Sequence, residues 1–480
     1  MRRAGNCIRW KPGACGILLA HALLLTGCVH YEAKPLSAAK EANAIDGRRL
    51  DDPALKDFVR MAAANSVTNW PPSSWNFETL TLVALYYNPN LEVARAQWGT
   101  ATAGIKTAGA RPNPILSVTP GYSANSPVGT SPWFPLGTLD VPIETAHKRR
   151  FRMNHAADLT EAARLNVYSA AWQVRSALRT ALIERNYAQA RFDLIEKQAQ
   201  AQRELVTLLE QRLAAGTIAT PEIAPARVIL LKALADLAVA RSQLATSGSG
   251  LAQALGVPLK ALEGVVIDYK AVLAGDHFEK YSNAEARDNA LQKRPDVLAS
   301  LAEYAAAEAA LQLEIAKQYP DVHLSPGYQF DQGEHKWSLG LSIELPVLNR
   351  NQGPIAEADA KRVEIAARFL ATQAKVISEV DRALQGYAAA EDQLRSSEAL
   401  LATQQKQAAA VEAALQAGGA DQYELLSARL EASVALLSVV ESQYKLQQTF
   451  GQLEDAFQFP FESLRNVDIK PLDKGHSEHL

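Results

Sequence analysis

Cysteine is nearly absent from this chain of 480 residues, which has only Cys7, Cys15 and Cys28. All three lie near the start, so the rest of the chain has no thiol that could form a disulfide. Methionine is equally scarce, and one of its three copies is the initiator, which argues against a methionine-lined copper site. Packing, not covalent cross-links, must therefore hold the fold together.

Long apolar runs and catalytic motifs are also missing. Beyond Leu25 no stretch approaches the roughly 18 apolar residues of a membrane-spanning helix, so a later crossing of a bilayer would need strands. The sequence has no phosphate-binding Gly-rich loop, no His-Glu-x-x-His and no Gly-x-Ser-x-Gly. We expect no enzyme activity, no catalytic residue, no bound metal and no cofactor, and we interpret His476 and His479 as solvated.

The first 27 residues are predicted to be a lipoprotein signal peptide. Four basic residues precede an apolar run from Gly16 to Leu25. The run ends in Leu25-Thr26-Gly27-Cys28, a bacterial lipobox pattern that predicts lipid attachment at Cys28. Val29 after it favours sorting to the outer membrane. The alternative is an ordinary secretory signal with an incidental cysteine.

The net charge argues against a nucleic-acid partner. The formal charge of the whole chain is -3 at pH 7. Residues 1–27 contain four basic residues and no acidic one, so their removal would bring the charge to -7. A mildly acidic chain lacks the basic surface that binding to nucleic acid requires.

The chain contains one sequence unit twice. Pro89, Pro114 and the tripeptide at 120–122 recur 206 positions later, and Trp133 recurs as Trp337 at a shift of 204. At a shift of 202, further matches pair Ala215-Gly216 with Ala417-Gly418 and Glu222 with Glu424. The shift changes only where loops tolerate insertions. Such order predicts two related structural repeats.

Each repeat is predicted to read helix, strand, strand, helix, helix. The first helices are expected at 78–110 and 283–318, ended by prolines. The long helix of the second repeat is expected at 355–416, a rod of about 90 Å. Its coiled-coil seam would comprise Val380, Leu384, Tyr387, Leu394 and Leu401. In the first repeat, Thr220 is the expected N-cap of the returning helix.

The strands of the second repeat alternate cleanly between apolar and polar residues. One face carries the side chains expected to face lipid: Val322, Leu324, Tyr328, Phe330, Trp337, Leu339, Leu341, Ile343 and Leu345. The other carries those expected to line a water-filled pore: His323, Ser325, Gln329, Ser338, Ser342 and Glu344. The first repeat has the same parity at Leu116, Val118, Tyr122, Leu139, Val141 and Ile143.

Strands of about nine residues match the length that crosses hydrocarbon at a tilt. Four strands cannot close a transmembrane barrel, because eight is the smallest usual number. We therefore expect three copies to pool twelve strands. The alternative is a soluble amphipathic hairpin packed on the helices.

From about Trp75 to Pro460 the architecture resembles the TolC-like outer-membrane efflux proteins. The segments 110–114, 147–149 and 345–353 look like stretches of its cobalt-zinc-cadmium (CzcC-like) branch, although that branch usually has glycine in place of His147. The resemblance implies a mainly α fold with a small β part. Long coiled-coil helices would form a periplasmic α-barrel, and four strands per protomer would contribute to a trimeric twelve-stranded outer-membrane β-barrel.

The same resemblance implies a division of the chain and a set of partners. The predicted segments are a signal peptide (1–27), a lipid-anchored extension (28–75), the first repeat (76–256), an equatorial linker (257–282), the second repeat (283–460) and a tail (461–480). The expected partners are two further copies, a periplasmic membrane-fusion adaptor, an inner-membrane pump of the resistance-nodulation-division type and outer-membrane lipid. The protein would span the outer membrane and extend into the periplasm.

The resemblance also implies a narrow periplasmic tip with a ring of acidic side chains. The matching residues here are Asp421 and Glu424, with Glu222 as the first-repeat counterpart. Such a ring would attract cations, with heavy metals as a candidate cargo. The local alternative is that these carboxylates only help a helix to start.

One rival function stays open at this point: a lipid-anchored periplasmic coiled-coil adaptor or spacer that does not enter the membrane. It would share the anchor and the long helices. A duplicated helix-hairpin-helix unit is not expected of an adaptor.

Overall fold

The structure is a computed structural model that describes residues 30–62, 69–273 and 284–458. The predicted signal peptide, its Cys28 and the tail at 461–480 lie outside the described residues. The chain forms two compact parts, residues 1–47 and residues 48–480. The smaller part contains helix α2 (Ala38–Asp46), which Ser37 caps by accepting a hydrogen bond from the Lys40 N–H. The larger part holds both repeats and is described below.

The helices of the larger part follow the predicted order. Before the first hairpin and after it lie α3 (Pro53–Ala62), α4 (Phe77–Tyr87), α5 (Pro89–Gly109), α6 (Lys148–Ala214) and α7 (Thr220–Leu255). The connection contains η1 (Leu259–Leu262) and α8 (Lys270–Leu273). The second repeat contains α9 (Ala284–Lys293), α10 (Pro295–Ala316), α11 (Gln352–Gln416) and α12 (Gln422–Phe457).

The first helix of each repeat is broken, and the prediction of continuous helices at 78–110 and 283–318 is wrong. α4 gives way to α5 at Asn88, and α9 to α10 at Arg294. Both residues are extended, with ψ angles of 121° and 132°. Each precedes a proline, Pro89 or Pro295, whose ring disfavours the helical conformation in the residue before it. The duplicated prolines thus set a duplicated break.

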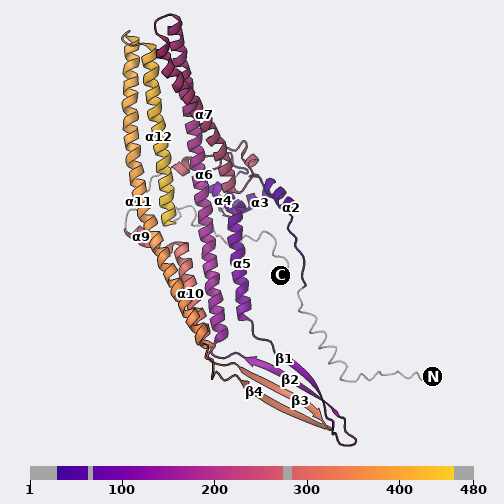
Figure 1. Ribbon diagram of the computed structural model, residues 1–480. Coiled ribbons are helices and arrows are strands. Elements are labelled where there is room, and N and C mark those ends of the chain that lie inside the picture. Colours follow the sequence, from indigo (N-terminus) through magenta and orange to yellow (C-terminus); the bar gives the residue numbers. More distant parts are fainter. Residues whose placement is uncertain (1–29, 63–68, 274–283, 459–480) are drawn as a thin grey trace, which may run out of the picture. The chain divides into compact units, whose positions relative to one another are not determined.

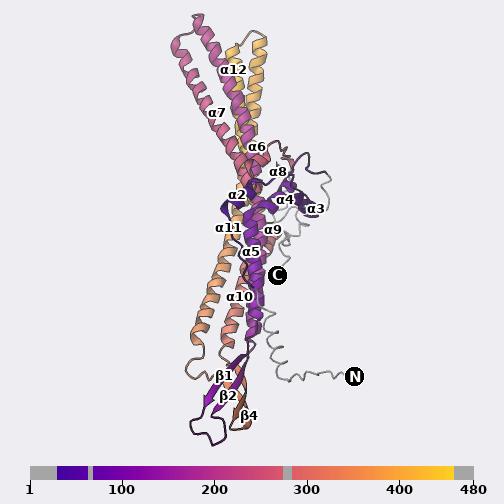
Figure 2. The same ribbon diagram turned by 90° about the vertical axis from the view of Figure 1, so that its right-hand side faces the viewer.

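The long helix of the second repeat, α11, is slightly longer than the predicted 355–416. α6 has 67 residues and α11 has 65, so each is a rod of about 100 Å. In α11 the expected seam residues Val380 and Tyr387 are buried. Each rod pairs with the shorter helix that follows it, and Figures 1 and 2 show both helical turns at the same end. Gly216 and Gly418 reverse the chain there with φ angles of 72° and 75°, which glycine adopts without strain.

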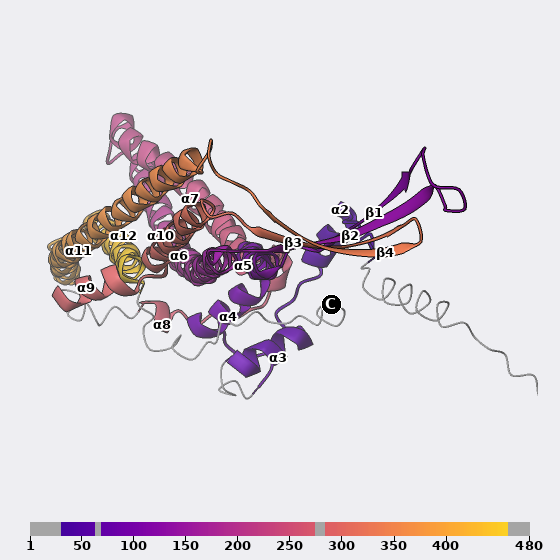
Figure 3. The same cartoon turned by 90° about the horizontal axis from the view of Figure 1, so that it is seen from below.

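The four strands form one antiparallel sheet in chain order. They are β1 (Ile115–Tyr122), β2 (Trp133–Ile143), β3 (Val322–Asp331) and β4 (Glu334–Ile343). The sheet lies at the opposite end from the helical turns (Figure 1), and the view along the helices shows it extending to one side of them (Figure 3). The pairing of β2 with β3 joins the two repeats, while β1 and β4 are the outer strands.

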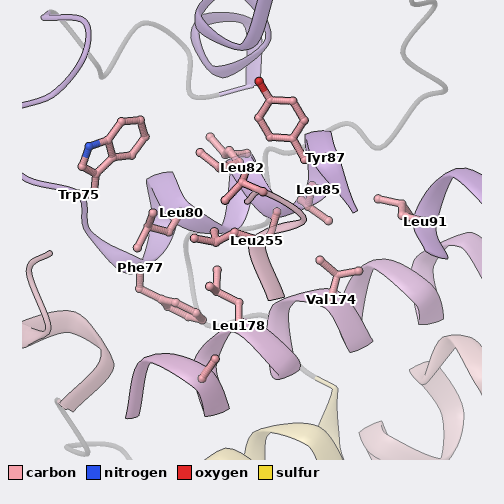
Figure 4. Packing of buried hydrophobic residues seen from close by; sticks show 14 of the residues in the cluster. Trp75, Phe77, Leu80, Leu82, Leu85, Tyr87, Leu91, Val174, Leu178 and Leu255 are labelled. Atoms are coloured by element: carbon pink, nitrogen blue, oxygen red, sulfur yellow. The ribbon is translucent and has the colours of Figure 1, made fainter. Parts of the chain in front are cut away.

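The main hydrophobic core lies midway along the helices, where α4 packs against α6 and the end of α7. Figure 4 shows Phe77, Leu80, Leu178 and Leu255 converging there. Each fully buried leucine contributes roughly 2 kcal/mol. Residues 48–75, predicted as part of the extension, also contribute to this core through Leu50, Leu55, Phe58, Val59 and Trp75.

The linker between the repeats is fixed to the start of the first one. Trp75 forms an isolated parallel bridge with Ile267. Its N–H donates to the carbonyl of Val266, and its own carbonyl accepts from Asp268. Within the described residues, none of the helices is both long and apolar enough to cross a membrane.

Candidate functional site

The strand register separates the sheet into the two faces that the alternation predicts. In antiparallel pairs, residues directly opposite one another share a face. Leu324 pairs with Leu341 on one side and with Val141 on the other. Leu116 pairs with Leu139 in the same way. An apolar face therefore runs across all four strands and both repeats.

This apolar face is open in the protomer. Leu116, Val118, Trp337, Leu339 and Leu341 each keep more than 60% of their surface exposed. A contiguous exposed apolar surface of this kind marks contact with a partner or with lipid. The helices do not cover this apolar face, because the sheet lies beyond their end. The alternative of a hairpin packed on the helices therefore does not describe these strands.

Aromatic pairs mark the loop end of each hairpin on this face. Tyr122 and Trp133 have ring centroids 5.0 Å apart, and Tyr328 and Trp337 have theirs 4.9 Å apart. The two pairs occupy equivalent positions in the repeats. Tyrosine and tryptophan at strand ends are typical of the aromatic girdle at a membrane interface.

The opposite face is polar in the second hairpin and mixed in the first. His323, Ser325 and Ser342 lie on it, as predicted from the alternation. In the first hairpin, however, the register also places Phe134 and Leu136 on this face. The Phe134 ring covers Gly121, since a Cβ on that glycine would lie 2.2 Å from the ring.

Glu344 and Leu345 lie just beyond the sheet. β4 ends at Ile343, so their assignment to the two strand faces needs correction. Proline follows at position 346 and cannot donate a ladder hydrogen bond, which favours an end to the strand here.

A hydrogen-bonded cluster on the polar face connects the repeats near the helical end of the sheet. His323 Nδ1 lies 2.9 Å from Asp140 Oδ2, and the Ser325 hydroxyl donates to Asp140 Oδ1 at 3.1 Å. His323 and Ser325 were predicted to line the pore from the alternation, whereas Asp140 was not among the predicted pore-lining residues. The position of Asp140 in β2 indicates that its side chain lies on the polar face. Only the register between β2 and β3 shows that it contacts His323.

The predicted gate residues Asp421 and Glu424 start helix α12. The Asp421 carboxylate accepts from the Glu424 N–H, and the Glu424 carboxylate accepts from the Asp421 N–H, both at 2.9 Å. This is a capping box, which satisfies two backbone donors at once. The bond from the Glu424 N–H, with Arg212 nearby, holds the pKa of Asp421 below its usual value.

Arg212 links the two helical hairpins close to their turns. Its guanidinium lies 2.9 Å from Asp421 Oδ2 and so connects the end of α6 to the start of α12. Below it, apolar residues of α6 and α7 form a small core on which α12 packs: Leu205, Val206, Leu209, Ile223 and Ala226, with Leu426 and Leu430. Arg212 was not predicted from the sequence, because its partner Asp421 lies in the other repeat.

The first-repeat counterpart of this helix start is simpler. Ala219 occupies the N-cap of α7 and Thr220 is its first residue, so the assignment of Thr220 as the cap was wrong by one position. Glu222 is placed as expected and accepts a hydrogen bond from the Ala219 N–H at 2.8 Å. An alanine cap has no side-chain acceptor, so only the second repeat offers two carboxylates.

Comparison with known proteins identifies the family. A sequence profile described as "Outer membrane efflux protein" matches residues 82–257 and again residues 286–457. The chain belongs to the outer membrane efflux protein family. This confirms the predicted family, and both matched segments contain a hairpin of the sheet.

Two relatives of the chain are similar in sequence. The cobalt-zinc-cadmium resistance protein CzcC of Cupriavidus metallidurans is 27% identical over 290 residues, which are 60% of this chain and 66% of the relative. Nodulation protein T of Rhizobium leguminosarum bv. trifolii is 21% identical over 230 residues, 45% of this chain and 48% of the relative. The matches span just under two thirds of the first relative and about half of the second.

Solved structures share the fold of this outer membrane efflux protein. VceC of Vibrio cholerae has a TM-score of 0.64 at 21% identity, over 80% of this chain and 97% of that one. The CmeC channel of Campylobacter jejuni has a TM-score of 0.64 at 15% identity, over 82% and 90%. CusC has a TM-score of 0.63 at 19% identity, over 79% and 91%. The predicted fold class, mainly α with a small antiparallel sheet, is confirmed.

The backbone at the junction between sheet and helices shows why glycine would suit position 147. His147, where the resembling branch has glycine, has φ 60° and ψ 22° in the left-handed region. Its second-repeat counterpart Asn351 has φ 63° and ψ 23°. Glycine adopts this conformation freely, asparagine tolerates it, and other residues are strained in it. The Lys148 ammonium beside it pairs with Asp321 at 2.8 Å and holds the junction.

Proposed function

We propose that this protein is the outer-membrane channel of a tripartite efflux system. The observation that carries the proposal is the four-stranded sheet at one end of two long helical hairpins, with an exposed apolar face and two outer strands, β1 and β4, that each have one neighbour. An outer strand with unpaired backbone groups cannot lie in hydrocarbon, so the sheet must close with other copies.

Three copies would close it as twelve strands, with the apolar face towards lipid and the polar face lining the pore. The helical hairpins of the three copies would then form the periplasmic α-barrel. Family membership and the fold shared with solved channels support this assembly. Cys28, outside the described residues, would anchor each copy in the outer membrane through lipid.

The duplication predicts which residues meet between copies. Within the protomer, Gly137 of β2 pairs with Tyr328 of β3. The equivalent of Gly137 in the second repeat is Leu341, and the equivalent of Tyr328 in the first is Tyr122. If the seam between copies repeats the seam within one, Leu341 will lie directly opposite Tyr122 of the partner.

Cysteine cross-linking tests the closure. Opposite residues of an antiparallel pair have Cβ atoms about 5 Å apart, within reach of a disulfide after small adjustment. We expect a variant carrying Leu341→Cys and Tyr122→Cys to form a covalent trimer on oxidation, since a lipid-modified Cys28 would have no free thiol. Moving one cysteine by a single position, with Ser342→Cys and Tyr122→Cys, places the thiols on opposite faces and gives the matched control.

On a denaturing gel, the Leu341→Cys and Tyr122→Cys pair should give cross-linked species up to the trimer and none larger. The control pair should give none. A protein that stays monomeric with both pairs would instead favour the periplasmic spacer, and the channel proposal would be abandoned. Conductance across a planar bilayer provides the second readout, because a spacer would not conduct.

The partners and the cargo belong to the same proposal. The channel would receive its cargo from a periplasmic adaptor and an inner-membrane pump of the resistance-nodulation-division type. The similarity to a cobalt-zinc-cadmium resistance protein supports heavy-metal cations as cargo. Co-purification with the adaptor and pump expressed together, and metal tolerance of cells with and without the channel, would test both points.

We propose that three copies of Asp421 and Glu424 form the acidic ring at the tip. The test variant is Asp421→Asn with Glu424→Gln, because asparagine and glutamine keep the capping box and remove only the charge. We expect its single-channel currents to lose cation preference, whereas the control Glu222→Gln keeps most of it. Unchanged selectivity in the double variant would show that the two carboxylates act only as helix caps.

A further inference from the structure

We propose that His323, oriented by Asp140, is a contact point for divalent transition-metal cations inside the channel. The inference rests on the proposed function, since the polar face lines a pore only if the sheet closes. It starts from the cluster in which Asp140 of β2 accepts hydrogen bonds from His323 and Ser325 of β3. The two strands belong to different repeats.

The carboxylate fixes which ring nitrogen is available. An ionised carboxylate can only accept hydrogen bonds, so Nδ1 of His323, at 2.9 Å from Asp140 Oδ2, carries the proton. In the neutral imidazole the other nitrogen, Nε2, then has a free lone pair. Metal-binding histidines show this arrangement almost always, with a carboxylate or carbonyl on the second nitrogen that orients the ring.

The ring is accessible to an ion in the pore. The His323 side chain keeps 42% of its surface exposed, and that of Asp140 keeps 32%. Both lie on the polar face, where Ser325 follows His323 along β3, and Ser342 of β4 and Pro142 of β2 lie opposite it. A hydrated cation could therefore exchange one water for the imidazole nitrogen without entering an apolar site.

Binding at this position should be weak and reversible. Among the described residues, the protomer has no group of three or more His, Cys, Asp or Glu that could hold a metal. One nitrogen ligand per copy leaves most of the hydration shell in place. Conduction needs a contact of this kind, since an ion must bind well enough to enter and poorly enough to leave.

The ligand type selects the class of ion. Imidazole suits zinc, copper, nickel and cobalt, whereas magnesium and calcium prefer oxygen ligands. The contact occurs once per protomer, because the first-repeat position equivalent to His323 is Ser117. A trimer would carry three such histidines, in a ring between the tip and the outer opening.

Zinc binding to the purified full-length channel, with magnesium as the comparison ion, tests the inference. His335 is the matched control, because it also lies on a strand but shares the apolar face with Phe330. Equilibrium dialysis over a range of zinc concentrations should show that His323→Gln binds less zinc per protomer than wild type while His335→Gln binds as much. Asp140→Asn should weaken zinc binding about 10-fold or more, since it removes the orienting carboxylate.

Zinc block of single-channel current is the second readout. The wild type and His335→Gln should be blocked by zinc and not by magnesium, and His323→Gln should lose the block. Equal zinc binding in wild type and His323→Gln would overturn the inference, whether or not the protein conducts. Failure to conduct, with His323-dependent zinc binding intact, would count against the pore and not against the metal contact.

Discussion

A buried group of charges fixes α12 against α6 midway along the helices. Glu454 of α12 lies 2.9 Å from the guanidinium of Arg179 and 3.4 Å from that of Arg175. All three residues are at most 5% exposed. Arg175 also covers the ring of Phe77 at 4.9 Å. Burial lowers the pKa of Arg179, and the Glu454 carboxylate is the largest opposing effect, with a smaller one from Asp455. Glu454 therefore contributes most to keeping this buried guanidinium charged.

Glu454→Gln should therefore destabilise the protein strongly. It leaves two buried guanidinium groups without their carboxylate, and breaking a buried pair in this way costs about 3 to 5 kcal/mol. The larger compact part spans residues 48–480. For a unit of this size, each kcal/mol of lost stability lowers the melting temperature by about 1 °C. We expect the melting temperature, followed by the helical circular dichroism signal in detergent, to fall by roughly 3 to 5 °C.

Glu412→Gln is the matched control. It also breaks a 2.9 Å pair, with Arg429, but there the side chains are about half exposed. An exposed pair contributes at most about 1 kcal/mol, so the melting temperature should fall by no more than about 1 °C. If both variants melt at the same temperature, the reasoning about the buried charges is wrong.

A third variant separates charge from packing. Replacing Arg175 and Arg179 by methionine together with Glu454→Leu removes all three charges of the group, while Asp455 keeps its hydrogen bonds from Trp172 and Ser176. Apolar replacement of a whole buried ion group is often neutral or stabilising, so this variant should recover most of the loss. A triple variant that melts below Glu454→Gln would show that the charges are needed as a group.

Three further predictions concern single positions. His147→Gly should raise stability by about 1 kcal/mol in chemical denaturation because it relieves the left-handed backbone, whereas His147→Ala should change it little. Gly256→Ala should lower the free energy of unfolding by about 1 to 3 kcal/mol, since φ at Gly256 is 71° and the new Cβ would lie 2.8 Å from the Tyr87 carbonyl oxygen. The control Gly250→Ala in α7, where a Cβ would meet no atom within 4 Å, should stabilise the protein slightly. Because the pKa of Asp421 is lowered, its stabilising contacts are complete above the usual aspartate pKa of about 3.9 and are lost as pH falls through the lower folded value. The melting temperatures of wild type and Asp421→Asn should therefore differ at pH 7 and converge in acid below about pH 4.

The sequence predicts features that depend on short-range periodicity. The alternation of apolar and polar residues from Val322 to Ile343 defines two strand faces without knowledge of their neighbours, and the register agrees with it. The long helices follow from the spacing of buried residues such as Val380 and Tyr387. The breaks at Pro89 and Pro295 were visible as prolines, but the apolar pattern on both sides of them suggested one helix.

Contacts between the repeats could not be predicted in the same way. Arg212 meets Asp421, and Asp140 meets His323, over separations of about 200 residues. Neither pairing leaves a periodic signal in the chain. Buried charges such as Glu454 are also hidden, because a charged residue on a helix usually faces solvent. These positions follow only from the packing of α12 on α6 and of β3 on β2.

The β2–β3 pairing has a consequence for how the assembled wall is made. Because one polypeptide carries both repeats, every second contact between repeats in the proposed ring would form within one chain, at a high effective concentration. Only the alternate contacts would depend on the concentration of copies. Dilution should therefore leave the β2–β3 joint between the two repeats of one chain intact while it opens the joint between β4 of one copy and β1 of the next. Six separate repeats would have to meet to form such a ring. With two repeats in one chain, only three molecules have to meet.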